Sequence, residues 1–209
     1  MKKVLSVLLI VAAVAAFGGV GIKTVVAATD NDPITVNLNV NATIAINCSE
    51  PITMGAITGT GKSDLTTNST TCNVKTNNNA GYKLEWTAST AAMTSGGDTI
   101  GAYTPGTSNI PETWSVGAAA AEWGARLSST STTAEAEWGT DDQSGVDYGT
   151  TSKWLNVATS ARQIADRVGT KTSAGGDDEV VNFGAEVGSS IFQATGTYTV
   201  DVTFTATTL

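Results

Sequence analysis

The sequence predicts an all-β protein, built as a β-sandwich. Short segments in which apolar and polar residues alternate recur from residue 34 to residue 207, and alternation with a period of two buries one face of a strand. Runs of Gly, Asn, Ser and Thr separate these segments, and such residues favour turns. Together the two observations are typical of a sandwich of short strands.

Residues 1–28 are typical of a secretory signal peptide. Lys2 and Lys3 precede an apolar run from residue 4 to residue 22, and small residues follow as far as Ala28. We therefore expect cleavage after Ala28 and a protein secreted to the cell surface. The apolar run is long for a signal peptide, so retention as a membrane anchor is the alternative. No later segment approaches the roughly 18 apolar residues of a transmembrane helix.

Residues 29–47 contain the most regular alternation of the chain. Apolar residues occupy every second position from residue 34 to residue 46, which predicts a strand with one buried face. These residues would span roughly 43 Å at about 3.3 Å per residue, far more than a usual strand of about 5–6 residues. Either the strand bends and serves both sheets of its own domain, or its first half pairs outside that domain as a donor strand. The side chains of that half are Ile34, Val36, Leu38 and Val40.

Residues 48–209 are expected to form the sandwich itself, stapled by a disulfide between Cys48 and Cys72. The chain has 2 cysteines, and two cysteines in an exported protein most simply pair. Cys48 continues the apolar row of the first strand, and Cys72 shares its parity with Val74. Closing a loop of about 25 residues contributes roughly 3.5 kcal/mol in the chain-entropy model.

Further alternating segments predict the remaining strands. The Asn- and Gly-rich residues 77–81 predict a hairpin loop that makes the first two of them antiparallel neighbours. The strands are expected at residues 69–76, 82–90, 122–127, 181–187 and 197–207. Their apolar parity predicts a core that contains Val74, Leu84, Trp86, Phe183, Val200, Val202 and Phe204.

Residues 160–169 carry a different signal. Ser160 and Gln163 have the spacing of a capping box, and Gly169 supplies a stop. The segment therefore predicts either a two-turn helix or an irregular strand, and the sequence leaves both open.

The middle of the chain, residues 93–178, has the weakest pattern, and we expect strands of the same sandwich joined by long loops. It holds four of the chain's five tryptophans, Trp114, Trp123, Trp138 and Trp154. Flat aromatic rings stack on sugars, so these four are candidate glycan contacts, and packing in the core is the alternative.

The composition argues against an enzyme. The chain has no histidine, which removes Ser–His–Asp triads, Cys–His pairs and histidine-ligated metals. The acidic segment 141–147 lacks the ligand register of a calcium loop. We expect it and the second acidic segment, 177–179, to be solvated loops, and calcium binding at either is the alternative. We therefore expect no catalytic residue, metal or cofactor.

The charge balance argues against nucleic acid as a partner. Three of the 11 basic residues precede residue 29, so 8 remain against 19 acidic residues, a net charge of −11. Phosphate backbones would be repelled by such a surface.

Both ends of the predicted sandwich resemble a known family. The alternating strand that ends at Cys48, then residues 51–55 (Pro-Ile-Thr-Met-Gly) and residues 71–74 (Thr-Cys-Asn-Val), resemble the spore coat protein U-like secreted pilins, relatives of chaperone–usher pilus subunits. Residues 196–204 resemble their last strand. The match covers about half of the mature chain. Residues 82–86 and the same C-terminal segment are also similar to WxL-type cell-surface domains, although Trp123-Gly124-Ala125 and Trp138-Gly139-Thr140 lack the leucine of the paired Trp-x-Leu motifs.

The pilin resemblance implies an immunoglobulin-like sandwich that lacks its last strand, which the N-terminal segment of a neighbouring subunit supplies. We therefore expect a structural subunit of a surface fibre, whose partners are further copies or other fibre subunits. The alternative is a monomeric surface module that binds a glycan or wall polymer of the cell or its host. A membrane is expected as a partner only through residues 1–28, if they are retained.

Overall fold

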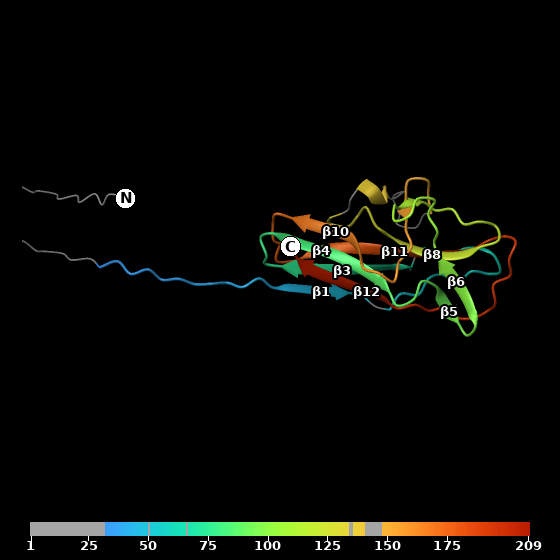
Figure 1. Cartoon of the computed structure of the whole chain (residues 1–209), viewed down its shortest axis with the longest axis horizontal. Helices are drawn as coiled ribbons and strands as arrows, with labels where there is room; N and C mark the ends of the chain where they lie inside the picture. Colours follow the sequence, from blue (N-terminus) through green and yellow to red (C-terminus); the bar gives the residue numbers. More distant parts are fainter. Residues whose placement is uncertain (1–31, 50, 66, 134–135, 141–147) are drawn as a thin grey trace, which may run out of the picture. The chain divides into compact units, whose positions relative to one another are not determined.

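The computed structural model describes residues 32–49, 51–65, 67–133, 136–140 and 148–209, and it shows an all-β sandwich (Figure 1). Residues Val40–Leu209 make one compact unit. The predicted fold class is therefore confirmed. The predicted signal peptide, residues 1–28, and the acidic segment 141–147 lie outside the described residues. Within the described part of the chain, no helix is long and apolar enough to cross a membrane.

The larger sheet, which we call sheet A, has the strand order β1-β3-β11-β8-β6-β5, with β2 (Gly61–Lys62) paired to β11 off this path. Neighbouring strands are antiparallel except β6 and β8, which are parallel. The strands are β1 (Ile44–Cys48), β3 (Ser69–Thr76), β5 (Met93–Ser95), β6 (Asp98–Ala102), β8 (Ala121–Leu127) and β11 (Asp177–Val187).

The smaller sheet, sheet B, has the strand order β10-β4-β12, all antiparallel. Its strands are β4 (Gly81–Ala88), β10 (Arg162–Val168) and β12 (Val202–Thr208). Thr199, within the segment predicted to begin the last strand, forms an isolated bridge with Thr94 instead, so the strand begins later than the alternation suggests.

Strands β3 and β4 lie in different sheets, so the predicted hairpin between them is wrong. The turn between them forms where expected, with the Gly81 N–H donating to the Asn78 carbonyl at 3.1 Å and Gly81 at φ 98°. A turn of this length can close a hairpin or carry the chain across the core to the opposite sheet. Here each strand buries the same parity against the other sheet, and neither pairs with the other.

The segment at residues 160–169 is the irregular strand β10 and not a helix. Its register to β4 shifts between Gln163 and Ala165, which marks a β-bulge. The bulge lets Ile164 and Ala165 both be buried, although they are consecutive in sequence. Pairing with β4 therefore overrides the local capping signal.

The main core lies between the two sheets. Of the predicted core residues, Val74, Leu84, Trp86 and Phe183 are buried, whereas Val200, Val202 and Phe204 are only partly buried and pack against it.

The predicted disulfide between Cys48 and Cys72 is present. The two cysteines lie opposite one another in the β1–β3 ladder of sheet A. The bond therefore fastens the edge strand β1 to its neighbour within one sheet.

A second cluster covers the outer face of sheet A. The short ribbon of β7 (Glu112–Thr113) and β9 (Lys153–Trp154) carries Trp154 into a group with Tyr103, Trp114 and Tyr148. Trp114 stacks on Tyr103 at 4.6 Å between ring centroids, and Trp154 stacks on Tyr148 at 5.2 Å. The cluster rests on the paired glycines Gly124 and Gly184, which lie opposite each other on β8 and β11.

The strand order matches much of an immunoglobulin-type sandwich. In that fold one sheet has the order A-B-E-D, and the other contains C, F and G. Strands β1, β3, β11 and β8 take the first four places, and β4 and β12 take those of C and F. One departure is that β10, beside β4, follows β8 in the chain. The described chain places no strand at the position of G, beside β12.

Candidate functional site

The edge of the sandwich between β1 and β12 is open. The two strands lie side by side in different sheets, and no backbone hydrogen bond joins them (Figure 1). A cavity of about 430 Å³ opens between the end of β1 and the start of β12. Its lining includes the core residues Met93, Trp123 and Phe183 together with Cys48, Val202 and Phe204 on the two edge strands. We call this cavity the edge groove.

Burial of the core-facing side chains identifies the same edge. On the inner strands β3 and β4, every second residue is fully buried, from Thr70 to Thr76 and from Tyr82 to Ala88. On β1 and β12 the corresponding residues, such as Ile46 and Phe204, are only half-buried. The core is therefore fully covered at the inner strands β3 and β4 and partly exposed to solvent at the edge strands β1 and β12.

The other two edges of the sheets are obstructed. On β10 the bulge interrupts the ladder, and the Trp138 N–H of the short helix η1 (Ala136–Trp138) donates to the Ile164 carbonyl at 3.2 Å. On β5 both backbone groups of Thr94 bond to Thr199 at 3.0 Å. Bulges and covered ends prevent further strand pairing, so β12 offers the most accessible edge in the described structure.

Among the described residues, no strand pairs with the predicted donor residues. Residues 32–43 contain no regular secondary structure, so the strand predicted from residue 34 begins only at Ile44. The exposed fractions are 84% for Ile34, 84% for Val36, 85% for Leu38 and 77% for Val40. The alternative in which this whole segment serves both sheets of its own domain is therefore not what the structure shows.

The four tryptophans predicted as glycan contacts are buried. Trp123 and Trp138 belong to the main core, and Trp114 and Trp154 belong to the outer aromatic cluster. None is more than 5% exposed. Hydrogen bonds within the protein also engage some of their N–H groups, as in the bond of 2.6 Å from Trp114 Nε1 to Glu186 Oε2. A sugar that stacks on these rings would require them at the surface, so their positions favour the core-packing alternative.

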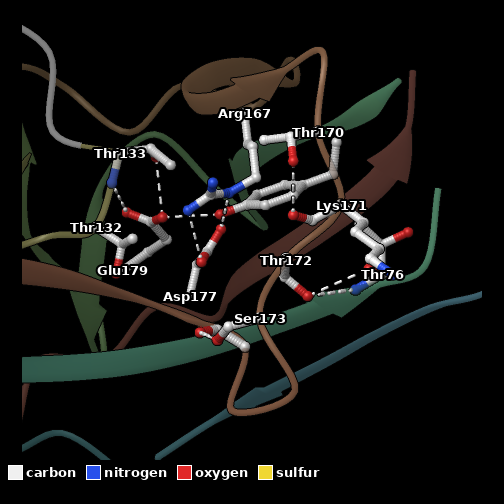
Figure 2. A network of polar contacts seen from close by, with 12 residues as sticks. Thr76, Thr132, Thr133, Arg167, Thr170, Lys171, Thr172, Ser173, Asp177 and Glu179 are labelled. Carbon is white, nitrogen blue, oxygen red and sulfur yellow. Dashed lines mark hydrogen bonds and ion pairs between the residues drawn. The ribbon is translucent and has the colours of Figure 1, made fainter. Parts of the chain in front are cut away.

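A polar network lies inside the sandwich near the turn between β3 and β4 (Figure 2). Glu179 on β11 is fully buried and accepts hydrogen bonds from Tyr82 Oη at 2.8 Å and Thr133 Oγ1 at 2.9 Å. Asp177 pairs with Arg167 of β10, whose Nη2 donates to Asp177 Oδ1 at 2.8 Å. The network therefore ties sheet A to sheet B.

Burial sets the protonation of this network. Burial raises the pKa of Glu179, against its hydrogen bonds with Tyr82 and Thr133, which lower it. Burial also raises the pKa of Tyr82, and the nearby charge of Glu179 raises it further. The hydrogen bond from Arg167 to Asp177 raises the pKa of the guanidinium. Glu179 is thus a carboxyl group whose charged form is disfavoured by burial and favoured by three donors, Tyr82 Oη and the hydroxyl and backbone N–H of Thr133.

The expectation that residues 177–179 form a solvated acidic loop is wrong for two of the three. Asp177 and Glu179 are buried, and only Asp178 is exposed. The signal was available, because residues 177 and 179 share the parity of Val181 and Phe183 on the same strand. Neither carboxylate lines the edge groove. In the described residues no group of three or more His, Cys, Asp or Glu side chains could hold a metal ion.

Comparison with protein-family models, with curated proteins and with solved structures found no match for this chain.

Proposed function

We propose that the protein is a secreted structural subunit of a surface fibre, assembled by β-strand complementation. Residues 34–40 of one copy would add to the free edge of β12 in the next copy, and their apolar side chains would fill its edge groove. The observation that carries the proposal is that the same chain contains both an exposed apolar segment, residues 34–40, and a core that is partly exposed at the edge groove.

The two parts match in length and chemistry. The donor segment, residues 34–40, and β12 each have seven residues and each span about 20 Å from end to end at about 3.3 Å per residue. The free edge of β12 offers backbone groups for pairing, and the groove lining includes the core residues Met93, Trp123 and Phe183. Strand addition uses main-chain hydrogen bonds for affinity and pockets for alternate side chains.

An incoming strand would have to separate β12 from β1 where these strands lie close together. Because no ladder joins them, the separation breaks no backbone hydrogen bond between them. Burying each of Ile34, Val36, Leu38 and Val40 contributes about 1.5–3 kcal/mol, from which the cost of ordering the segment is subtracted. The groove lies where the two strands are already apart, so strand entry would begin there.

Export and the disulfide support the same proposal. Residues 1–28 have the composition of a signal peptide, and a disulfide such as Cys48–Cys72 persists in oxidising surroundings. The proposal accordingly places the fibre outside the cell.

The test is electron microscopy of the purified mature protein and of two double variants. We expect filaments from the parent protein and none from Val36→Asp with Leu38→Asp, because the new carboxylates would be buried against Met93, Trp123 and Phe183, in a groove whose lining already includes the acidic Asp201. The matched control is Asn37→Asp with Asn39→Asp, which adds the same charge to the same segment on the opposite parity. We expect the control to form filaments.

Circular dichroism and thermal unfolding complete the test. The Val36/Leu38 variant should stay folded with an unchanged Tm, since both side chains are more than 80% exposed. If that variant unfolds the isolated domain, the segment belongs to its own core and strand donation is wrong. Filaments from both variants alike would equally refute the donor role of this row.

A further inference from the structure

A fully exposed aromatic side chain lies at one end of the sandwich. Phe192, in the loop that follows β11, is 98% exposed. The loop around it is held by hydrogen bonds from Gln193 Nε2 to the Thr99 carbonyl at 3.1 Å and to Tyr198 Oη at 2.7 Å. The ring is therefore presented to solvent on a fixed support.

A pocket of about 390 Å³ lies at the other end of the same strand. It is lined by the start of β1, the end of β3 and the loop before β11, with Ile44, Ala45 and Thr172 among its residues. Strand β11 runs from that loop to the Phe192 loop, and its 11 residues span about 33 Å at roughly 3.3 Å per residue. Within one molecule the ring and the pocket are thus too far apart to meet.

Strand donation would bring the two together between copies. Val40, the last donor side chain, is three residues from Thr43, which lines the pocket, so at most about 11 Å of chain separates them. The edge groove of the receiving copy has Trp123 in its floor, which pairs with Ala185 near the C-terminal end of β11. If residues 34–40 run antiparallel to β12, as the paired strands of sheet B do, Val40 lies at the start of β12, and the pocket of the donor then faces the end of the receiver that carries Phe192.

We propose that Phe192 of the receiving subunit inserts into the pocket of the donating subunit, as a second contact between consecutive copies of this chain. The proposal rests on the proposed function. The occupant we assign to the pocket is a second copy, because the same end of the molecule supplies the donor segment. A contact between two different surfaces repeats from copy to copy and generates a filament wherever the rotation between copies does not close a ring.

Exposed residues near the two surfaces carry charges of opposite sign. The exposed Lys75 and Lys171 line the pocket. Near Phe192, the carbonyl that Gln193 contacts belongs to Thr99, whose neighbour Asp98 is an exposed acid. Opposite charges that meet at such a contact fix its orientation.

The test measures the critical concentration for filament formation by sedimentation of the mature protein. Phe192→Ser removes the ring, and Ala45→Trp fills the pocket from an exposed position on β1. Burying one Phe side chain corresponds to about 10–100-fold in an equilibrium constant, so we expect each variant to raise the critical concentration at least about tenfold. The matched control is Ile110→Ser, which removes another exposed apolar side chain and should change nothing.

The double variant distinguishes a shared contact from two separate effects. If ring and pocket touch, Phe192→Ser combined with Ala45→Trp should be no worse than either change alone. Filaments of the parent protein together with an unchanged critical concentration for Phe192→Ser would refute this contact and leave strand donation intact. A parent protein that forms no filaments would refute both.

Discussion

The packing of the outer aromatic cluster on Gly124 predicts that replacing this glycine by alanine destabilises the fold. A Cβ at this position would lie 2.7 Å from the Leu155 carbonyl oxygen and 2.9 Å from Tyr103 Cβ. The Leu155 backbone cannot retreat easily, because it exchanges two hydrogen bonds of 2.9 Å with the neighbouring Ala125. Gly124→Ala therefore forces the ribbon away from sheet A.

The magnitude follows from a comparison with Gly117→Ala. A methyl group added at Gly117 would have no atom within 4 Å, so this replacement only reduces the backbone freedom of the unfolded chain, which stabilises the fold by about 0.4–1 kcal/mol. That gain is common to both variants and cancels in their difference. What remains is overpacking at Gly124, which typically costs about 1–3 kcal/mol.

Thermal and urea unfolding of the two variants measure this difference. At about 2–4 °C per kcal/mol for a domain of this size, a cost of about 2 kcal/mol lowers the Tm of Gly124→Ala by roughly 4–8 °C relative to Gly117→Ala. Gly184→Ala should fall between them, since its Cβ would meet side-chain atoms, Tyr148 at 2.8 Å and Trp154 at 3.0 Å, and no backbone atom. Equal stability of Gly124→Ala and Gly117→Ala would refute the view that the aromatic cluster rests directly on these glycines.

Two further predictions concern buried polar groups. Because the pKa of Glu179 is raised, its stabilisation is present below the unfolded value of about 4.3 and is lost as the pH rises through the folded value. Urea unfolding across pH should therefore show that, between pH about 4.3 and the folded pKa of Glu179, the free energy of unfolding of Glu179→Gln rises relative to that of the parent protein. The rise is at most about 1.4 kcal/mol per pH unit, and parallel curves of stability against pH would contradict the prediction. Separately, Trp138→Phe should destabilise more than Trp86→Phe by about 1 kcal/mol, because Trp138 donates to Ile164 whereas the Trp86 N–H has no acceptor in the described residues. Equal losses in thermal unfolding would count against that assignment.

Individual strands could be predicted because alternation is a local property. Strand β3 has the predicted bounds, and β8 differs by a single residue. The partner of each strand could not be predicted, since pairing depends on residues far apart in sequence. The turn at residues 77–81 is compatible with a hairpin or with a crossing between sheets, and only the competing partners β11 and β10 decide between them.

The N-terminal segment shows a different limit. Its alternation is unbroken through Ile44, yet the strand starts there because β3, its partner, ends at Thr76, opposite Ile44. The Asn77 side chain then closes the ladder by accepting from the Thr43 N–H at 2.7 Å and donating to the Asn41 carbonyl at 3.0 Å. Sequence periodicity thus predicts which residues are able to form a strand, and the length of the partner strand determines which of them do so.

The tryptophans were ambiguous for a related reason. Trp123 lies on the inner parity of a clear strand, but Trp154 lies in a strand of two residues, which has no readable period. Its burial depends on the paired glycines of β8 and β11, which make room for rings on the outer face of sheet A. A glycine on each of two strands becomes informative only once the register places them opposite one another.

The chemistry of the sheet edges bears on the whole proposal. Proteins protect exposed edges with charges, prolines, bulges or covering segments. The edges at β10 and β5 have such protection, whereas β12 consists of Val, Thr, Phe and Ala with no charge and no proline. An unprotected strand with a half-buried core beneath it promotes pairing with another chain, and the same sequence contains an exposed segment of matching length and period. Selection against aggregation would remove this combination unless the pairing were itself useful, which favours an assembling subunit over a monomeric surface module.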